Sequence, residues 1–590
     1  MIIDLSKQFP LMPIYPFRAA GALERLYFRL KNWTEVIRTY EQVSLVSEEL
    51  FKTQFTRGGK EAWLQEAQFL PTLAAFSYSK TGNLELAVQV LENGRTQLLR
   101  EALESQRRDL ERLPELGFEA EYDAYTKARD SYQDLVNSPE QMISASERIY
   151  RLEKARDLLN TAIRTIHEHV GAEHSQYSRF MKSMSFAEIQ SIATLVPLVY
   201  LVDTRHGCLV VIITKTAVKT IQVDTLTTDL INEWLIHRTD INPTGGYLSA
   251  LLGYAPIKPE LDELLVLLGE TLCRPLAVEL RTTGTKAVVL IPTGLLSLFP
   301  LHAAPLDLDH NISTTLLDEF EVSYAPSASG LRNSQESLTL LETPALSLLA
   351  VGNPMPLPES YRSLEFAQLE AKTISQRLFS QAILLEGMEA TRELVEKNLA
   401  EAFYLHFACH GEFNPVNPLA SGLILSYGKY LNVNDILEKL RLHQPTRLVV
   451  LSACKTALID FSKLPEEAIG LPAGFMQAGT IGVIGTLWPV DDLSTTLLMA
   501  QFYEYHLKGH PEMGGKPLSP SDALRRAQLW LRDATASELR DYVKRKLSTQ
   551  STNFTLTSVR GAYKRLLLED DDSHPYDHPY YWAGFSFHGI

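Results

Sequence analysis

From about residue 345 the chain alternates short apolar strands with amphipathic helices, and this alternation strongly limits the folds open to it. The strands are continuous apolar runs such as "SLLAV", "FYLHF", "RLVVL" and "IGVIG". The helices are expected at 363–378, 390–400, 433–441, 467–477 and 493–507. Apolar strands joined by helices predict an α/β fold with a mostly parallel sheet covered by helices on both faces. In such sheets, functional groups gather at the carboxyl ends of the strands.

Residues 191–330 show a second α/β pattern. The run "VPLVYLVDTRHGCLVVII" predicts a hairpin that turns at Arg205–Gly207, and "KAVVLIPTG" predicts another buried strand. We therefore expect an upstream α/β lobe over 191–330 and a second lobe over 340–590. The polar segment 329–339, "SGLRNSQESLT", is interpreted as the linker between them.

Residues 1–190 are expected to form an all-helical region. Two of its segments align with each other, "LYFRLKNWTEVIRTYEQ" from Leu26 and "SYSKTGNLELAVQVLEN" from Ser77. The second copy places an aromatic, a turn residue, a small residue and a large residue in the order of a tetratricopeptide helix pair. These residues are Tyr78, Gly82, Ala87 and Leu91. The copies lie farther apart than the usual repeat of about 34 residues, so an ordinary helical hairpin is the alternative.

Composition and charge exclude several classes of protein. A net charge of −15 without a Lys/Arg-rich block argues against direct binding of nucleic acid or of an anionic membrane. Four cysteines in 590 residues do not make a disulfide framework. The N-terminus lacks a signal-peptide pattern, and the apolar stretch 287–306 contains three prolines. We therefore expect a cytoplasmic protein without a membrane segment, and, since no nucleotide-binding motif appears, without a cofactor.

Two strand ends in the second lobe carry reactive side chains. His410 and Gly411 end the run "FYLHFACHG", and Cys454 ends "LVVLSAC". The stretch between them is long enough for a crossover that brings the strands side by side, so both side chains would meet at one edge. A nearby imidazole raises the thiolate fraction of a cysteine and later protonates the leaving amine. His410 and Cys454 are therefore the candidate catalytic pair, with the N–H groups of Gly411 and Cys454 as the candidate oxyanion hole.

Metal binding is one alternative for these residues. His406, Cys409, His410 and Cys454 are all possible zinc ligands. On an extended strand, however, His406 and His410 would lie about 13 Å apart, and Cys409 would point to the opposite face. No metal site is expected, and we interpret His406 and Cys409 as packing or supporting residues.

Four motifs of the chain resemble those of the CHAT family, caspase-like cysteine peptidases that occur joined to tetratricopeptide repeats. They are "HFACHGEF", "VVLSACKTA", "GLPAGFMQAGTIGVIGTLWPVDD" and "HPYYWAGFSFHG", and the resemblance covers about 195–590. It implies a caspase-like fold with His410 and Cys454 as the dyad, preceded by a related pseudo-peptidase lobe without a dyad. It also implies an intracellular endopeptidase that cleaves a protein substrate under control of a partner bound to the N-terminal helices. Relatives act in bacterial antiviral defence and programmed cell death.

Asp491 and Asp492 follow the strand "TIGVIGTLW" at the expected catalytic edge. A carboxylate in a partly apolar pocket pairs well with a guanidinium group. The segment "LWPVDD" also resembles the corresponding stretch of separases, whose pocket takes an arginine before the scissile bond. This resemblance implies a substrate-binding role, with Asp492 as the matching position. The alternative is that Asp491 or Asp492 caps the helix that follows.

Two further expectations concern regulation. Segment 455–466, which follows the candidate nucleophile, is long for a connection between a strand and a helix. We expect it to be mobile until a partner or substrate binds, with a static surface loop as the alternative. For the whole protein, the alternative to a peptidase is a catalytically silent scaffold that acts through its repeats.

Overall fold

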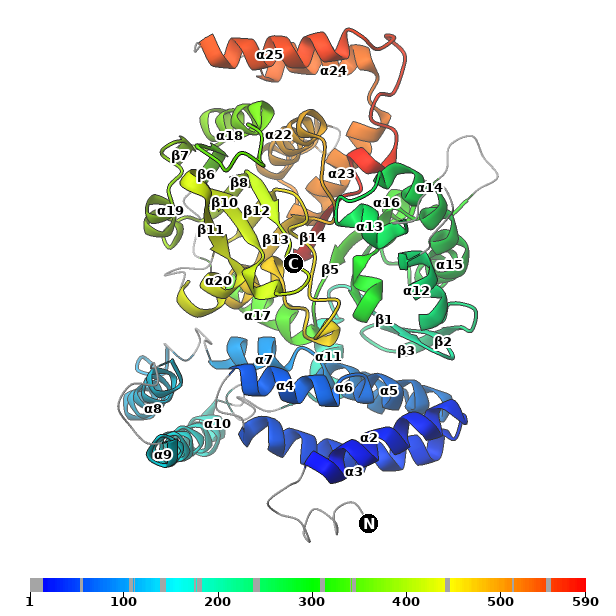
Figure 1. Ribbon diagram of the computed structural model, residues 1–590, viewed down its shortest axis with the longest axis vertical. Helices are drawn as coiled ribbons and strands as arrows, with labels where there is room; N and C mark the ends of the chain where they lie inside the picture. The colour runs from blue at the N-terminus through cyan, green and yellow to red at the C-terminus, as the bar shows by residue number, and fades with distance from the viewer. Residues whose placement is uncertain are drawn as a thin grey trace. The chain divides into compact units, whose positions relative to one another are not determined.

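The chain forms two compact units, Met1–Ile189 and Gln190–Ile590, in a computed structural model (Figure 1). The first unit is helical, the second is mixed α/β, and each has its own hydrophobic core. The structure describes residues 14–53, 57–105, 110, 112–137, 145–174, 177, 183–236, 245–307, 314–339, 341, 346–440, 446–511, 514–547 and 553–590.

The first unit is built from helices throughout its described residues. They are α2 (Ile14–Arg29), α3 (Trp33–Thr53), α4 (Arg57–Ala67), α5 (Leu70–Lys80), α6 (Leu84–Gly94), α7 (Gln97–Ser105), α8 (Glu119–Asn137), α9 (Ala145–Thr165), α10 (Gly171–Glu173) and α11 (Phe186–Ile192), which continues into the second unit. None of the helices in the described parts of the chain is long and apolar enough to cross a membrane.

The two aligned segments of the first unit form similar helical hairpins, α2–α3 and α5–α6. Lys31 and Gly82 occupy the same place in the alignment, and both turn the chain with a left-handed backbone, at φ 56° and 84°. Val36 and Ala87, which are also aligned, are both fully buried. The internal similarity of the sequence therefore corresponds to a repeated helical hairpin.

One sheet of eleven described strands forms the centre of the second unit, in the order β3-β2-β1-β4-β5-β14-β13-β12-β8-β6-β7. The strands are β1 (Leu198–Thr204), β2 (Gly207–Ile213), β3 (Val218–Val223), β4 (Ala287–Pro292), β5 (Glu321–Tyr324), β6 (Ser347–Pro354), β7 (Gln381–Gly387), β8 (Tyr404–Ala408), β12 (Leu448–Ser452), β13 (Gly482–Thr486) and β14 (Phe585–Gly589). Three more strands form a small separate sheet, β9 (His410–Glu412), β10 (Gly422–Leu425) and β11 (Lys429–Asn432).

The large sheet has two halves whose parallel strands run in opposite directions. In the downstream half (β6–β8 and β12–β14), β6, β7, β8, β12 and β13 are parallel, and β14 is antiparallel to β13. In the upstream half (β1–β5), β1, β4 and β5 are parallel to β14, and the halves join where His588 of β14 pairs with Tyr324 of β5. The predicted mostly parallel sheet is confirmed, and both expected lobes contribute to it.

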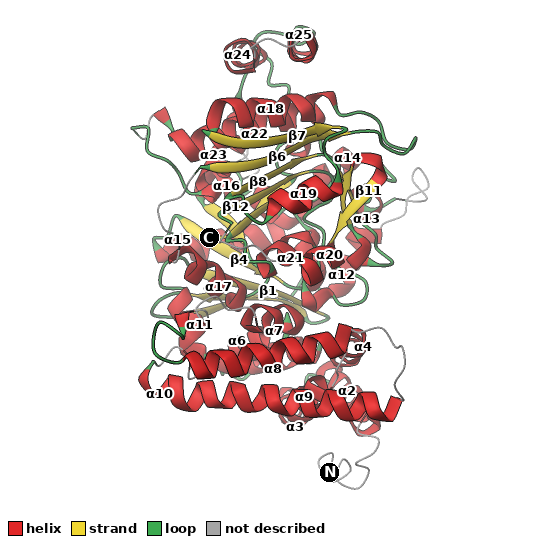
Figure 2. Cartoon of the chain, turned by 90° about the vertical axis from the view of Figure 1, so that its left-hand side faces the viewer, coloured by secondary structure: helices red, strands yellow, loops and turns green. Residues whose placement is uncertain are grey.

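Helices cover both faces of this sheet (Figures 1 and 2). Those of the second unit are α12 (Thr228–Ile236), α13 (Tyr247–Leu251), α14 (Ile257–Leu268), α15 (Arg274–Thr283), α16 (Leu316–Glu319), α17 (Ala328–Thr339), α18 (Glu365–Leu378), α19 (Arg392–Leu399), α20 (Val433–Lys439), α21 (Leu471–Gln477), α22 (Asp492–Lys508), α23 (Pro520–Asp533), α24 (Ala536–Tyr542) and α25 (Asn553–Leu566). In Figure 2, α18 and α22 lie on one side of the strands and α17 and α21 on the other.

The expected linker over 329–339 is wrong, because this segment is helix α17. Its composition is polar, but the small residues fall at helical spacing and face the interior, so that Ala328, Leu331 and Ser334 are all buried. A serine-rich helix with a small-residue packing face and a solvated linker have similar compositions, and this similarity misled the interpretation.

Candidate active site

Strands β8 and β12 bring the two candidate catalytic residues to one edge of the sheet. They are parallel neighbours, and their last paired residues are Ala408 and Ser452. His410 and Cys454 each follow two positions after that pair. The predicted adjacency of the two strands is confirmed. Strand β8 stops at Ala408, and His410 begins β9 in the small sheet, so the chain bends between them.

Gly411 lies against the main chain of Cys454. A Cβ atom at Gly411 would overlap the carbonyl oxygen of Cys454 and would lie 3.1 Å from the methyl group of Thr456. Any larger residue would push the strand that carries His410 away from the loop that carries the thiol. The close approach that requires a glycine is therefore between the segment that carries His410 and the segment that carries Cys454.

A main-chain carbonyl orients the imidazole of His410. Its Nε2 lies 2.7 Å from the carbonyl oxygen of Arg362, in the loop between β6 and α18. A carbonyl only accepts hydrogen bonds, so Nε2 carries the proton and Nδ1 presents a lone pair. Burial lowers the pKa of His410, the bond to the carbonyl opposes this, and the positive charge of Arg362 lowers it further. The ring is therefore a neutral base near neutral pH.

The thiol of Cys454 is partly exposed at the surface of this edge. Burial raises its pKa, while the N–H of Val490 and the charge of Lys455 act in the opposite direction. Both side chains are described, and no hydrogen bond joins His410 to Cys454. The lowered pKa of His410 and the raised pKa of Cys454 both favour the uncharged forms, a neutral imidazole and a thiol.

Hydrogen bonds fix the loop that carries Cys454 to the end of β13. The N–H of Thr486 donates to Oγ1 of Thr456 at 3.0 Å, and the N–H of Ala457 donates to the carbonyl of Thr486 at 2.8 Å. The hydroxyl of Thr486 donates to the carbonyl of Ala453. Lys455 takes a left-handed conformation, at φ 60°, which is uncommon for a residue with a side chain. This strained turn aims Cys454 out of the sheet edge.

Segment 455–466 is held by several contacts, which favour the static loop over the mobile one. Asp460 accepts hydrogen bonds from the N–H groups of Lys463 and Leu464, at 2.9 and 3.1 Å. Phe461 stacks on Phe413, with the ring centroids 5.6 Å apart. These contacts give the segment a defined conformation, and its mobility in solution stays a prediction.

The two candidate substrate-binding carboxylates have different surroundings. Asp491 caps α22, because its Oδ1 accepts from the N–H of Ser494 at 3.0 Å, and its Oδ2 pairs with Arg565 at 2.7 Å. Asp492 accepts only the N–H of Phe366, at 3.2 Å, and forms no ion pair within the described chain. Burial raises the pKa of Asp492 to about 7. Both carboxylate oxygens of Asp491 are thus used within the protein, by the helix cap and by the ion pair, while the carboxyl group of Asp492 has no ionic partner among the described residues.

His406 and Cys409 lie in the interior. His406 is fully buried, with its Nε2 2.9 Å from Oε1 of Glu370 on α18. Cys409 is 2% exposed, and burial raises the pKa of its thiol. Both positions agree with the interpretation of these residues as packing or supporting groups.

Sequence reasoning missed three groups around His410. The carbonyl of Arg362 has no sequence signature, because every residue has a carbonyl. Tyr361 places its ring 5.1 Å from the imidazole and donates a hydrogen bond to Glu412. Tyr430 of β11 donates to the same carboxylate. Glu412, the acidic residue directly after His410 and Gly411, was the one feature of the sequence that indicated further polar groups here.

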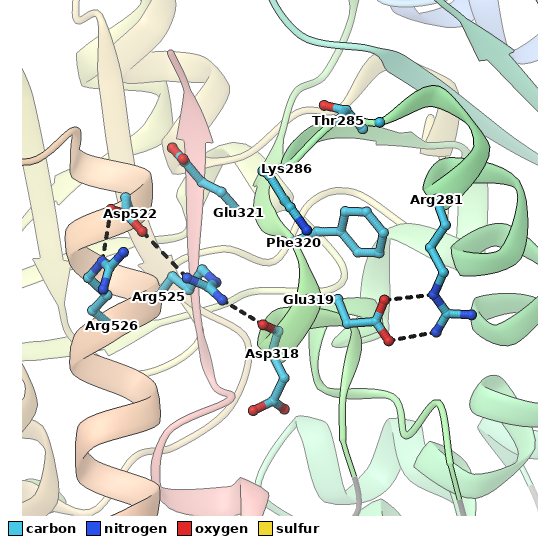
Figure 3. Close-up of a pocket in the computed structure, with 11 residues that line it drawn as sticks. Arg281, Thr285, Lys286, Asp318, Glu319, Phe320, Glu321, Asp522, Arg525 and Arg526 are labelled. Atoms are coloured by element: carbon cyan, nitrogen blue, oxygen red, sulfur yellow. Dashed lines mark hydrogen bonds and ion pairs between the residues drawn. The ribbon is translucent and has the colours of Figure 1, made fainter.

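A separate cavity of about 790 Å³ lies among α15, α16, α23, the segment just before β4 and the first residue of β5 (Figure 3). Its charges largely neutralise each other, since Arg281 forms two hydrogen bonds to Glu319, and Arg526 bonds to Asp522 at 2.9 Å. Neither candidate catalytic residue lines it. This cavity is distinct from the edge that carries the thiol.

Comparison with known proteins gives one family and a set of remote structural likenesses, two of which are described below. The sequence matches the CHAT domain over residues 262–589. None of the curated proteins is significantly similar to it in sequence. The separase–securin complex of Saccharomyces cerevisiae matches with 10% identity and a TM-score of 0.38, over 100% of this chain and 48% of the separase chain. The Arg specific cysteine proteinase gingipain R matches with 10% identity and a TM-score of 0.31, over 52% of this chain and 62% of its own. Likenesses this remote assign no residues, substrates or partners.

Proposed function

Because this chain belongs to the CHAT domain family, we propose that it is a caspase-like cysteine endopeptidase, with Cys454 as nucleophile and His410 as acid and base. One observation carries the proposal: these residues each follow, by two positions, the ends of neighbouring parallel strands, and the main chains of Gly411 and Cys454 lie against each other. A thiol and an oriented imidazole at one exposed sheet edge suit nucleophilic attack on a peptide carbonyl.

The reaction follows from the tautomer of the imidazole. Nδ1 of His410 removes the proton from the thiol of Cys454 as the sulfur attacks the peptide carbonyl carbon. The protonated ring then gives that proton to the leaving amine as the C–N bond breaks, and an acyl thioester remains. His410 next takes a proton from water, which attacks the thioester and releases the carboxylate product and the thiol. Nε2 of His410 keeps its proton throughout and donates it in a hydrogen bond to the carbonyl of Arg362.

Two further roles complete the proposed site. The N–H groups of Gly411 and Cys454 form the oxyanion hole, and the contact between these two segments supports that role. Asp492 binds an arginine before the scissile bond, because its carboxyl has no ionic partner and sits in a partly buried place. Asp491 uses both of its oxygens within the protein, so the substrate contact falls to Asp492.

The regulation and setting of the enzyme are proposed from the family and from the helical unit. Repeated helical hairpins of the tetratricopeptide kind bind protein segments, so the first unit would bind a regulatory protein partner. The enzyme would act in the cytoplasm on a protein substrate, in bacterial antiviral defence or programmed cell death. A catalytically silent scaffold remains the second candidate, because the resting site has no hydrogen bond between His410 and Cys454.

Covalent labelling tests the proposal directly. A peptidyl vinyl probe should label the full-length protein at a single site, and Cys454→Ala should remove the label. Cys409→Ser is the matched control and should retain it, because Cys409 is buried. Labelling that survives Cys454→Ala would refute the assignment. Co-purification with the Cys454→Ala protein, followed by mass spectrometry, would then identify substrate and partner together.

A further inference from the structure

Glu412 stands directly after the His-Gly pair and accepts two phenol hydrogen bonds on one oxygen. The hydroxyl groups of Tyr361 and Tyr430 both donate to its Oε2, the former at 2.7 Å. The bonds from Tyr430 and Tyr361 lower the pKa of Glu412, so the carboxylate is ionised at neutral pH. Such charge-assisted bonds are stronger than bonds between neutral groups.

The three members of this cluster come from three separate segments. Glu412 ends β9, Tyr430 belongs to β11, and Tyr361 lies in the loop between β6 and α18. The cluster therefore ties that loop to the small sheet that begins with His410. The far side of the loop is tied to β6, because the side chain of Asn353 accepts the N–H of Leu364 at 2.9 Å.

The loop delivers the group that orients His410. Arg362 follows Tyr361, and its carbonyl accepts Nε2–H at 2.7 Å, while the ring of Tyr361 packs 5.1 Å from the imidazole. Moving this loop by about 1 Å would break that bond and free the imidazole to rotate. Glu412 touches no reacting atom, yet it fixes the carbonyl that fixes the base.

We propose that Glu412, clamped by Tyr361 and Tyr430, is a positioning residue that holds the Arg362 carbonyl against His410. The inference rests on the proposed role of His410 and adds the group that sets its tautomer and direction. It predicts that Glu412 and its two tyrosines act as one unit. Removing any member loosens the same loop, so removing a second member has little further effect.

Alkylation of Cys454 by iodoacetamide tests this without a known substrate. Its rate would be measured by mass spectrometry on the full-length protein between about pH 5 and pH 9, where imidazole and thiol titrate. We expect Glu412→Gln to slow the reaction at neutral pH about tenfold, since small displacements of a catalytic group have effects of this size or larger. The change in alkylation rate with pH that depends on His410 should also become smaller.

The tyrosines provide the decisive comparison. Tyr430→Phe should slow alkylation about threefold, and Glu412→Gln with Tyr430→Phe should be no slower than Glu412→Gln alone. Tyr427→Phe is the matched control, because that side chain is 54% exposed on the preceding turn, and it should react like the wild type. If Glu412→Gln fails to fold, the same comparison of single and double variants can be made with Tyr361→Phe and Tyr430→Phe.

Each result decides between the two proposals. Additive losses with an unchanged pH profile would mean that these residues act independently, and would overturn the positioning role. Wild-type rates in Glu412→Gln, together with slow alkylation in His410→Ala, would overturn the positioning role alone. Wild-type rates in His410→Ala would overturn the proposed catalytic pair, and the positioning role with it.

Discussion

The parts of the second unit built around the upstream and the downstream half of the sheet both contain cysteine and histidine, but they place these residues in different environments. In the upstream half Cys208 and Cys273 are 0% and 1% exposed, and burial raises the pKa of both thiols. His302, which follows β4, is 2% exposed, and burial lowers its pKa to about 4. In the downstream half His410 and Cys454 follow the ends of adjacent strands and are both partly exposed.

This difference shows that position relative to the strand end decides which of these side chains reach solvent. Cys409 is next to His410 in sequence, yet it is as buried as the upstream cysteines and has a similarly raised pKa. Two residues past the last paired position, the side chains leave the core and reach solvent. An exposed strand end combines access for substrate with a rigid support, and a buried one offers neither.

The largest predicted effect is that substitutions of cysteine and histidine abolish peptide cleavage in the downstream half but not in the upstream half. Cys454→Ala and His410→Ala should each lower peptide cleavage by a factor of about 10⁴ or more, and the double variant should be little worse, since the pair acts as one unit. Cys208→Ala, in the upstream half, should keep the activity of each folded molecule. A fluorogenic peptide library measures all four proteins. Full activity of Cys454→Ala would break the comparison.

The next prediction concerns the residue before the cleaved bond. Asp492→Asn should lower kcat/KM for substrates with arginine at that position by about tenfold to a hundredfold, as expected for loss of a charge pair. The carboxyl gains its charge as the pH rises through about 7. Cleavage after arginine should therefore increase relative to cleavage after leucine over that interval. A cleavage preference for acidic or apolar residues at that position would rule out this role.

Burial of histidines at the join between the halves should make the second unit sensitive to acid. His302 and His588 have folded pKa values of about 4, below the ordinary 6.5. The unfolded chain therefore binds more protons as the pH falls below 6.5, and stability decreases until about pH 4. At pH 5 each histidine should cost about 2 kcal/mol of unfolding free energy.

Urea unfolding at neutral pH and at about pH 5 checks this effect. His302→Gln should reduce the pH dependence, and His574→Gln, at an exposed position, should leave it unchanged. An equal pH dependence in all three proteins would show that the buried histidines contribute nothing to the acid sensitivity.

The smallest predicted effect concerns segment 455–466 beside the nucleophile. The bonds from Lys463 and Leu464 to Asp460 predict slow hydrogen exchange of these two amides in the free protein. Asp460→Ala should accelerate their exchange. Ser462 lies in the same turn, and its hydroxyl also donates a hydrogen bond to the carbonyl of Pro415. Fast exchange in the wild type would restore the mobile loop that the sequence suggested.

Much of the downstream half could be predicted from the sequence because its signals are local. Continuous apolar runs and amphipathic spacing placed strands such as β8 and β12, and their crossover length implied that they pair. The cap at Asp491 was also a local signal, since Asp before a helix is a common N-cap.

The remaining features depend on contacts that are distant in the sequence. Strand β14, from the end of the chain, pairs with both β13 and β5 and so joins the two halves, and no local pattern predicts such partners. In the site, His410 and Cys454 were visible as reactive side chains at strand ends. The carbonyl of Arg362 was not, because a main-chain acceptor leaves no trace in the residue type.

The most direct test of the account is a comparison of alkylation rates at all four cysteines of the native protein. Isotope-coded iodoacetamide and mass spectrometry would give a rate for each thiol in the wild type and in His410→Ala. We predict that Cys454 reacts at least about a hundredfold faster than Cys208, Cys273 and Cys409, and that His410→Ala slows Cys454 alone. Unchanged reactivity of Cys454 in His410→Ala would contradict the central claim that these two strand ends form one reactive site.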